Sequence, residues 1–250
     1  MGELDGLTIS IPTRRKPPIL TLESYGAPAH VIVLSDPEVF EDHKEYYRDM
    51  SGIQVVLGKQ GQGPQNSALY STAHTLGYLY FFKLDDDLPP KTFIHKDGHY
   101  PSLEEAIVEA RRCIVETETS HAGFANGSNR HWMSIGYGRT WGLIHGGANI
   151  ARSSPDGDKF CDPRVRCEDV YRTCAHREQD GAVGRVKHIG FDKKKSTVVA
   201  GNSNRMETLT QELFEADREF ILNRFPGMVT CDGSREVNGV IIPNWRMRRG

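Results

Sequence analysis

Short runs of β-branched and aromatic residues alternate with segments of helical periodicity in the first part of the chain. The apolar runs cover residues 7–12, 30–35, 53–58 and 78–84. Their length and composition are typical of buried strands. Helical patterns lie between them, one over residues 35–50 and one over residues 63–77. Strands and helices in alternation predict a parallel sheet with crossover helices.

The pattern changes after residue 100. Residues 102–116 begin with Ser102 and Glu105 in capping-box spacing and carry one apolar stripe, which predicts a scaffold helix. Residues 121–152 are rich in glycine and aromatics without helical spacing, which favours antiparallel strands and loops. Residues 206–225 form an amphipathic pattern, and a basic tail follows it.

Three consecutive aspartates, Asp85, Asp86 and Asp87, follow directly on the apolar run 78–84. The carboxyl end of a central parallel strand lies in the crevice where open α/β sheets bind ligands. Because neighbouring carboxylates repel, each added charge costs more unless a cation neutralises them. Oxygen ligands on a short turn suit Mg²⁺ or Mn²⁺. The alternative is a solvated acidic turn, and the aromatic strand before it favours the metal site.

Composition narrows the class of protein. The chain has 250 residues, of which 38% are hydrophobic and 26% charged, as expected for one soluble α/β domain. No apolar run is long enough for a membrane span and the N-terminus lacks a secretory pattern, so we expect a cytosolic protein with no membrane partner. The five cysteines include no CxxC pair, which favours reduced thiols.

The net charge of −2 is unevenly distributed. Residues 1–130 hold 12 Lys and Arg against 18 Asp and Glu, whereas residues 131–200 hold 12 against 8. The later part of the chain is therefore suited to an anionic partner.

Several motifs, taken in order, resemble those of inverting GT-A-fold glycosyltransferases. They are "LTISIPTRR", "GKQGQGPQNSALYSTAHTLGYLYFFKLDDDL", "GGANIAR" and "CEDVYRTCAHREQDGAVGRVKHIGF". The resemblance spans roughly residues 7–195. It implies an α/β, GT-A-like fold: a Rossmann-type, mostly parallel central sheet with flanking helices and a smaller antiparallel acceptor-side portion.

The resemblance also implies how one domain, 1–250, would be organised. Residues 1–95 would bind the nucleotide sugar, residues 96–200 would hold the acceptor and the catalytic groups, and residues 201–250 would form a C-terminal helix and basic tail. The motifs "KLDDDLPP", "GGANIARSSPD" and "CEDVYRTCAHRE" are more narrowly similar to the phage TET-associated glycosyltransferases. That family implies 5-hydroxymethylcytosine in DNA as acceptor and, for a phage-encoded protein, the host cytoplasm as location.

Carried over residue by residue, the resemblance implies a donor site for a UDP-sugar with Mn²⁺ or Mg²⁺. Asp85 and Asp87 would bind the metal together with His188, and Asp85 or Asp86 would contact the ribose or a bridging water. A lone histidine between apolar residues is more often structural. The other donor contacts implied are Pro12, Thr13 and Arg14 at the end of the first strand, Asp36, Gly146, Gly147, Asn149, and Lys195 in the basic run 192–197. Asp36 fits a helix cap equally well.

An inverting transfer needs a general base that takes the proton of the acceptor hydroxyl. The pair Glu168 and Asp169 resembles the family's catalytic pair, with Asp169 as the base. The competing interpretation is an acidic helix start. A glycan, protein or small-molecule acceptor, a nucleotidyltransferase and a non-catalytic nucleotide-sugar binder remain as alternatives to the DNA-modifying enzyme.

Overall fold

A nine-stranded sheet forms the centre of the computed structural model, which describes residues 5–127, 129–192, 211–237 and 240–249. The strand order is β3-β2-β1-β4-β8-β6-β9-β5, and β7 also pairs with β9. The strands are β1 (Leu7–Thr13), β2 (Val31–Ser35), β3 (Ile53–Leu57), β4 (Tyr80–Leu84), β5 (Phe93–His95), β6 (His121–Asn126), β7 (Tyr137–Thr140), β8 (Ala148–Arg152) and β9 (Val183–Phe191).

The first four strands confirm the expected parallel half. β1 pairs in parallel with both β2 and β4, and β2 pairs in parallel with β3. β8 runs antiparallel to β4 and to β6, while β6 and β9 are parallel again. β5 and β7 each pair antiparallel with β9. The reversed strands therefore lie in the second half of the sheet, where the antiparallel portion was expected.

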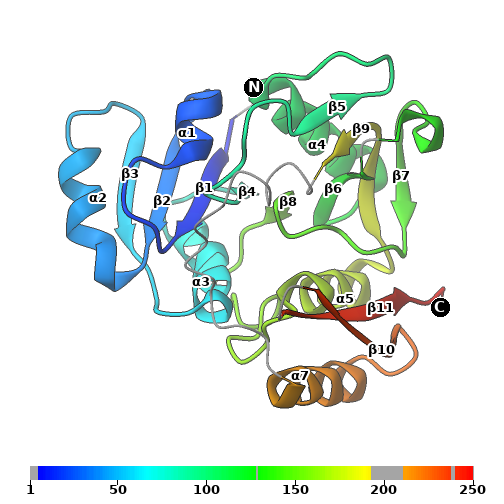
Figure 1. Cartoon of the computed structure of the whole chain (residues 1–250). Coiled ribbons are helices and arrows are strands. Elements are labelled where there is room, and N and C mark those ends of the chain that lie inside the picture. The colour runs from blue at the N-terminus through cyan, green and yellow to red at the C-terminus, as the bar shows by residue number, and fades with distance from the viewer. Residues whose placement is uncertain (1–4, 128, 193–210, 238–239, 250) are drawn as a thin grey trace.

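Helices cover both faces of the sheet (Figure 1). Their bounds are α1 (Leu20–Tyr25), α2 (Phe40–Tyr46), α3 (Gln62–Thr75), α4 (Leu103–Thr117), α5 (Glu168–Asp180) and α7 (Gln211–Arg224), with 3₁₀ turns η1 (Pro37–Val39) and η2 (Arg130–Trp132). The stripe of α4 packs with the β-sheet residues Ile9 and Phe82 in one core, whereas α3 and α5 share a second core with Phe81. Neighbouring residues of β4 thus point to opposite layers, as the two-residue period of a strand dictates.

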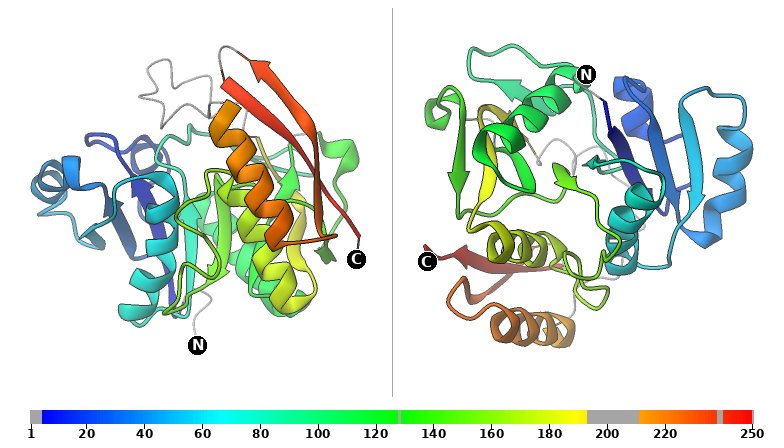
Figure 2. Two further views of the ribbon diagram at one scale, coloured as in Figure 1. Left: turned by 90° about the horizontal axis from the view of Figure 1, so that it is seen from below. Right: turned by 180° about the vertical axis from the view of Figure 1, so that it is seen from behind.

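The C-terminal segment forms more than the expected helix and tail. Helix α7 is followed by β10 (Val229–Val237) and β11 (Val240–Met247), which pair antiparallel as a separate two-stranded sheet. Ile221 and Phe225 join the core of α5, so α7 and the hairpin lie on the outside of that helix (Figure 2). The predicted basic tail is therefore in large part a strand, and Arg246 on it contacts Asp232 at 3.0 Å.

Candidate functional site

The three aspartates lie directly after β4, between the carboxyl end of β1 and the loop that enters β8. The Thr13 hydroxyl donates to Asp86 Oδ2 at 2.6 Å, and Arg15 Nη2 donates to Asp87 Oδ2 at 3.0 Å. The Thr21 hydroxyl donates to the carbonyl of Asp85 at 2.6 Å. The segment that follows β1 therefore closes over the acidic turn, because parallel neighbouring strands end at the same edge.

The carboxylates of the acidic turn are partly removed from water. Burial raises the pKa of Asp86 to about 6, although the Thr13 hydroxyl and Arg15 act in the opposite direction. Burial and the neighbouring Asp85 also raise the pKa of Asp87. Charge crowding of this kind is stabilised by a bound cation.

Lys83 is a member of this site that the sequence pattern did not single out. Its buried Nζ donates to Asp85 Oδ1 at 2.5 Å and to the carbonyl of Gly146 at 2.5 Å. Asn149 stands opposite Lys83 in the β4–β8 register, and its Nδ2 donates to the same carbonyl at 3.1 Å. Lys83 thus ties the acidic turn to the predicted donor residues Gly146 and Asn149. The available signal was a lysine within the run "YFFKL".

The two glycines before β8 allow a close approach between separate parts of the site. A Cβ on Gly147 would lie 2.7 Å from the Phe191 ring and 3.1 Å from Asp85 Oδ2, and the Gly147 carbonyl accepts from the Asp85 N–H at 2.9 Å. A Cβ on Gly146 would lie 2.7 Å from Glu168 Oε1. Because Gly146 and Gly147 have no side chains, the start of α5 can lie next to the loop that contacts the aspartates.

The two carboxylates at the start of α5 have different surroundings. Glu168 Oε2 lies 3.0 Å from Nη2 of Arg172, and their side chains are 5% and 1% exposed. Asp169 is half-buried, and its Oδ1 accepts from the adjacent Val170 N–H at 2.9 Å. The β-carbon of Asp169 lies 3.6 Å from the Cβ position of Gly146. Glu168 is engaged in an internal ion pair, and Asp169 is the more accessible acid beside the donor loop.

The ends of β1 and β2 lie together as expected. Pro12 pairs with Leu34 across the two strands, and the N–H of Asp36 donates to the carbonyl of Thr13 at 2.9 Å. Asp36 caps η1 by accepting from Glu38 N–H at 3.2 Å, and Arg14 Nε lies 3.2 Å from its other oxygen. The capping role of Asp36 is therefore observed. A contact between Asp36 and the nucleobase of the donor stays a prediction.

One predicted metal residue, His188, has its partners outside this group. His188 has both ring nitrogens in hydrogen bonds, Nε2 with Glu109 at 2.7 Å and Nδ1 with the Gly136 carbonyl at 3.1 Å. These partners belong to α4 and to the loop before β7, not to the acidic turn. Lys195 lies outside the described residues.

A basic cleft of about 400 Å³ lies over β6, β7 and β9. Its charged lining residues are Arg139, Arg185 and Lys187, and Trp132 at its rim is 86% exposed. No carboxylate occurs among the described residues that line it. Three of the 12 Lys and Arg of residues 131–200 therefore line this cleft.

Comparison with known proteins supports the fold. No protein-family model matches the chain, and no curated protein sequence matches it. The structure of the TarS 1–349 fragment from S. aureus in complex with UDP-GlcNAc matches with a TM-score of 0.53 at 14% identity, covering 87% of this chain and 66% of that one. The present chain therefore spans slightly less than two thirds of that structure's length.

Two further solved structures match less well. A CMP:2-keto-3-deoxy-manno-octonic acid synthetase complexed with CTP has a TM-score of 0.37 at 11% identity, over 74% of this chain and 89% of that one. A 4-diphosphocytidyl-2C-methyl-D-erythritol synthase from Anaerococcus prevotii has a TM-score of 0.39 at 12% identity, over 86% and 99%. At these TM-scores the two add nothing to the assignment. In the part of the chain that the structure describes, we find no helix with the length and apolarity of a membrane span. The strand order and the TarS match together show a GT-A-like fold.

Proposed function

We propose that this protein is a glycosyltransferase that binds a UDP-sugar beside the acidic turn and transfers the sugar to a hydroxyl acceptor with inversion. The observation that carries the proposal is the convergence of three segments far apart in the sequence. Asp85 contacts Lys83 and Gly147, and Gly146 joins Lys83 to Glu168 at the start of α5. A donor bound at the aspartates would thus have its sugar next to the half-buried carboxylate of Asp169.

The donor contacts follow from this placement. Thr13, Arg14 and Asp36 lie at the ends of β1 and β2, where the nucleoside would be held, and the backbone of Gly146 and Gly147 would lie against the sugar. UDP-GlcNAc, the ligand in the TarS complex, is the first donor to test.

We infer that two carboxylates of the acidic turn, those of Asp85 and Asp87, bind a divalent cation. Lys83 and Arg15 contact the turn, so two cationic groups face three carboxylates. The side chains of Asp85 and Asp87 remain 33% and 21% exposed, so an ion can reach both. An all-oxygen set of this kind suits Mn²⁺ or Mg²⁺. Asp85 and Asp87 would hold the ion, which when bound acts as a Lewis acid that stabilises the departing diphosphate. His188 is left out of this set, because both its ring nitrogens contact groups outside the acidic turn, Glu109 and the Gly136 carbonyl.

In the chemical step, Asp169 acts as the general base. The acceptor oxygen forms a bond to the anomeric carbon while the bond from that carbon to the UDP oxygen breaks, and the acceptor proton passes to the Asp169 carboxylate. Glu168 is a positioning residue here, since its ion pair with Arg172 fixes the first turn of α5 beside Gly146.

Removing Asp87 or the divalent cation should weaken UDP-GlcNAc binding. We expect Asp87→Ala to lower the affinity by at least about 10-fold, as loss of groups around metal sites commonly does. Titration calorimetry with UDP-GlcNAc, with Mn²⁺ or with EDTA, measures the effect. Asp49→Ala is the control, because Asp49 is an exposed carboxylate outside the site. Equal affinity in all these comparisons would exclude the donor site proposed here.

The acceptor that we propose is 5-hydroxymethylcytosine in DNA. The positive charge of the cleft would attract an anionic polymer such as DNA. The exposed Trp132 offers a ring on which an extruded nucleobase could stack. Phosphate contacts by Arg139, Arg185 and Lys187 would give salt-sensitive binding.

Transfer to DNA is tested with duplexes that carry 5-hydroxymethylcytosine or plain cytosine. Nucleoside mass spectrometry should find sugar only on the hydroxymethylated base, and Trp132→Ala should slow the transfer about 10-fold through lost stacking. Ile135→Ala is the matched control, since Ile135 is a neighbouring apolar side chain that is 85% exposed. Sugar on neither DNA, with a glycan or protein labelled instead, would refute the DNA acceptor and leave the transferase proposal standing.

A further inference from the structure

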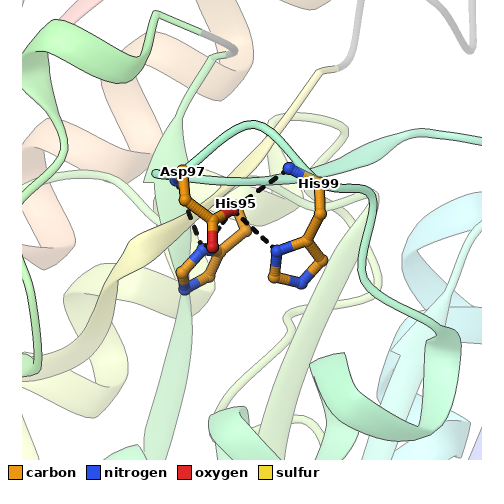
Figure 3. Close-up of side chains that lie close together, drawn as sticks. All are labelled: His95, Asp97 and His99. Atoms are coloured by element: carbon orange, nitrogen blue, oxygen red, sulfur yellow. Dashed lines mark hydrogen bonds and ion pairs between the residues drawn. The ribbon is translucent and has the colours of Figure 1, made fainter.

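A second group of metal-ligating side chains lies on the turn that follows β5, apart from the acidic turn. His95, Asp97 and His99 occupy alternate positions, and their side chains point toward one another (Figure 3). The His95 N–H donates to the His99 carbonyl at 2.9 Å, and the Gly98 N–H donates to the His95 carbonyl at 2.9 Å. Gly98 has φ +104°, a conformation that residues with a side chain rarely adopt. The backbone therefore holds the three side chains on one side of a closed turn.

One carboxylate oxygen is the meeting point of the group. Asp97 Oδ1 lies 2.9 Å from His95 Nδ1 and 2.7 Å from His99 Nδ1, and the three ligand atoms lie within 4.8 Å of one another. His99 Nδ1 is hydrogen-bonded to this oxygen, whereas His95 Nδ1 faces the same oxygen and also accepts from the Asp97 N–H at 3.3 Å. A cation placed among these atoms would meet both nitrogens and the carboxylate. Tetrahedral zinc bonds of about 2.0–2.1 Å place neighbouring ligand atoms about 3.3 Å apart. The two nitrogen–oxygen spacings at Asp97, 2.9 and 2.7 Å, are within about 0.6 Å of that value.

The second nitrogen of His99 is held in the way typical of metal-binding histidines. His99 Nε2 lies 3.1 Å from Glu105 Oε1, in the first turn of α4. A carboxylate on the far nitrogen fixes the ring orientation and increases the basicity of the near nitrogen. The His95 ring stacks on the His99 ring at 4.5 Å and meets the His188 ring edge-on at 5.4 Å, and His188 in turn contacts Glu109. Both imidazoles of the turn are thus supported by neighbouring elements.

We propose that His95, Asp97 and His99 form a Zn²⁺ site, with Glu105 as the group that orients His99. Two neutral imidazoles and one carboxylate are a donor set that Zn²⁺ accepts in proteins, with water in the remaining position. Mg²⁺, in contrast, prefers oxygen ligands. The site is therefore chemically distinct from the aspartates after β4, and it does not depend on the proposed transferase activity.

The test measures Zn²⁺ binding to the full chain by calorimetry in excess Mg²⁺, which occupies oxygen-only sites. We expect one Zn²⁺ per chain. Asp97→Asn and His99→Ala should each weaken binding by at least about 10-fold, and Glu105→Gln by about 10-fold. Co²⁺ in place of Zn²⁺ should give visible absorption bands that the double variant His95→Ala/His99→Ala lacks.

The control is His74→Ala, since His74 is an exposed histidine outside the turn. Circular dichroism of each variant verifies the fold, and all the substituted side chains of the turn are at least partly exposed. Zn²⁺ affinity in the double variant within twofold of His74→Ala overturns the proposal, as does a wild-type chain that binds no Zn²⁺.

Discussion

Asp169→Asn is expected to lower the rate of sugar transfer by about 10²- to 10⁴-fold, the usual loss when a general base is removed. The amide keeps the size of the side chain and can still accept from the Val170 N–H, which the carboxylate does at 2.9 Å. Donor contacts at the acidic turn stay unchanged. We therefore expect UDP-GlcNAc affinity by calorimetry to match the wild-type value while turnover falls, whether a hydroxyl or water accepts the sugar.

Two further variants test whether the loss of turnover is specific to Asp169. Asp156→Asn changes an exposed aspartate on the loop after β8 and should leave turnover within twofold. A slow Glu168→Gln together with a fully active Asp169→Asn would move the base by one residue. The anomeric configuration of the product, read by NMR, provides an independent check, because retention would rule out a single displacement with Asp169 as base.

The parts of the fold and site that local pattern determines could be predicted from the sequence. The apolar runs gave the parallel strands β1 to β4, and the Ser102 cap of α4 is present, with its hydroxyl accepting from Glu105 N–H at 3.1 Å. The aspartates follow β4 directly, so a prediction of the strand also located the turn. Their contacts with Thr13 and Arg15 follow from parallel neighbours that end at one edge.

The remaining parts depend on register between distant segments. Lys83 and Asn149 meet only because β8 pairs antiparallel with β4, and nothing in either local sequence specifies that pairing. His188 lies 79 positions from Glu109, its partner, so local sequence could not predict the histidine–carboxylate contact that the fold forms there. The metal role of His188 was implied by the resemblance alone. Local sequence does not predict the β10–β11 hairpin, because β11 contains Pro243 and ends in the basic segment of Arg246, Arg248 and Arg249, which is typical of an exposed tail.

Glu168→Gln is expected to lower the free energy of unfolding by about 3–5 kcal/mol, the cost of removing one partner from a buried ion pair. The side chain of Arg172 is 1% exposed and lies 3.0 Å from Glu168, so the substitution leaves a guanidinium charge without its carboxylate inside the core shared by α3 and α5. Urea unfolding followed by circular dichroism measures the loss.

The same helix supplies a matched control. Glu178 and Arg224 form a pair at 2.5 Å whose side chains are 44% and 38% exposed, and Glu178→Gln should cost less than about 1 kcal/mol, because water screens exposed pairs. Adding Arg172→Met to Glu168→Gln should restore part of the lost stability, since the unpaired charge is then removed. If Glu168→Gln and Glu178→Gln lower the free energy of unfolding equally, Glu168 does not stabilise a buried charge. Its carboxylate would then be free for a direct role beside Gly146, and the division of tasks between Glu168 and Asp169 would have to be reversed.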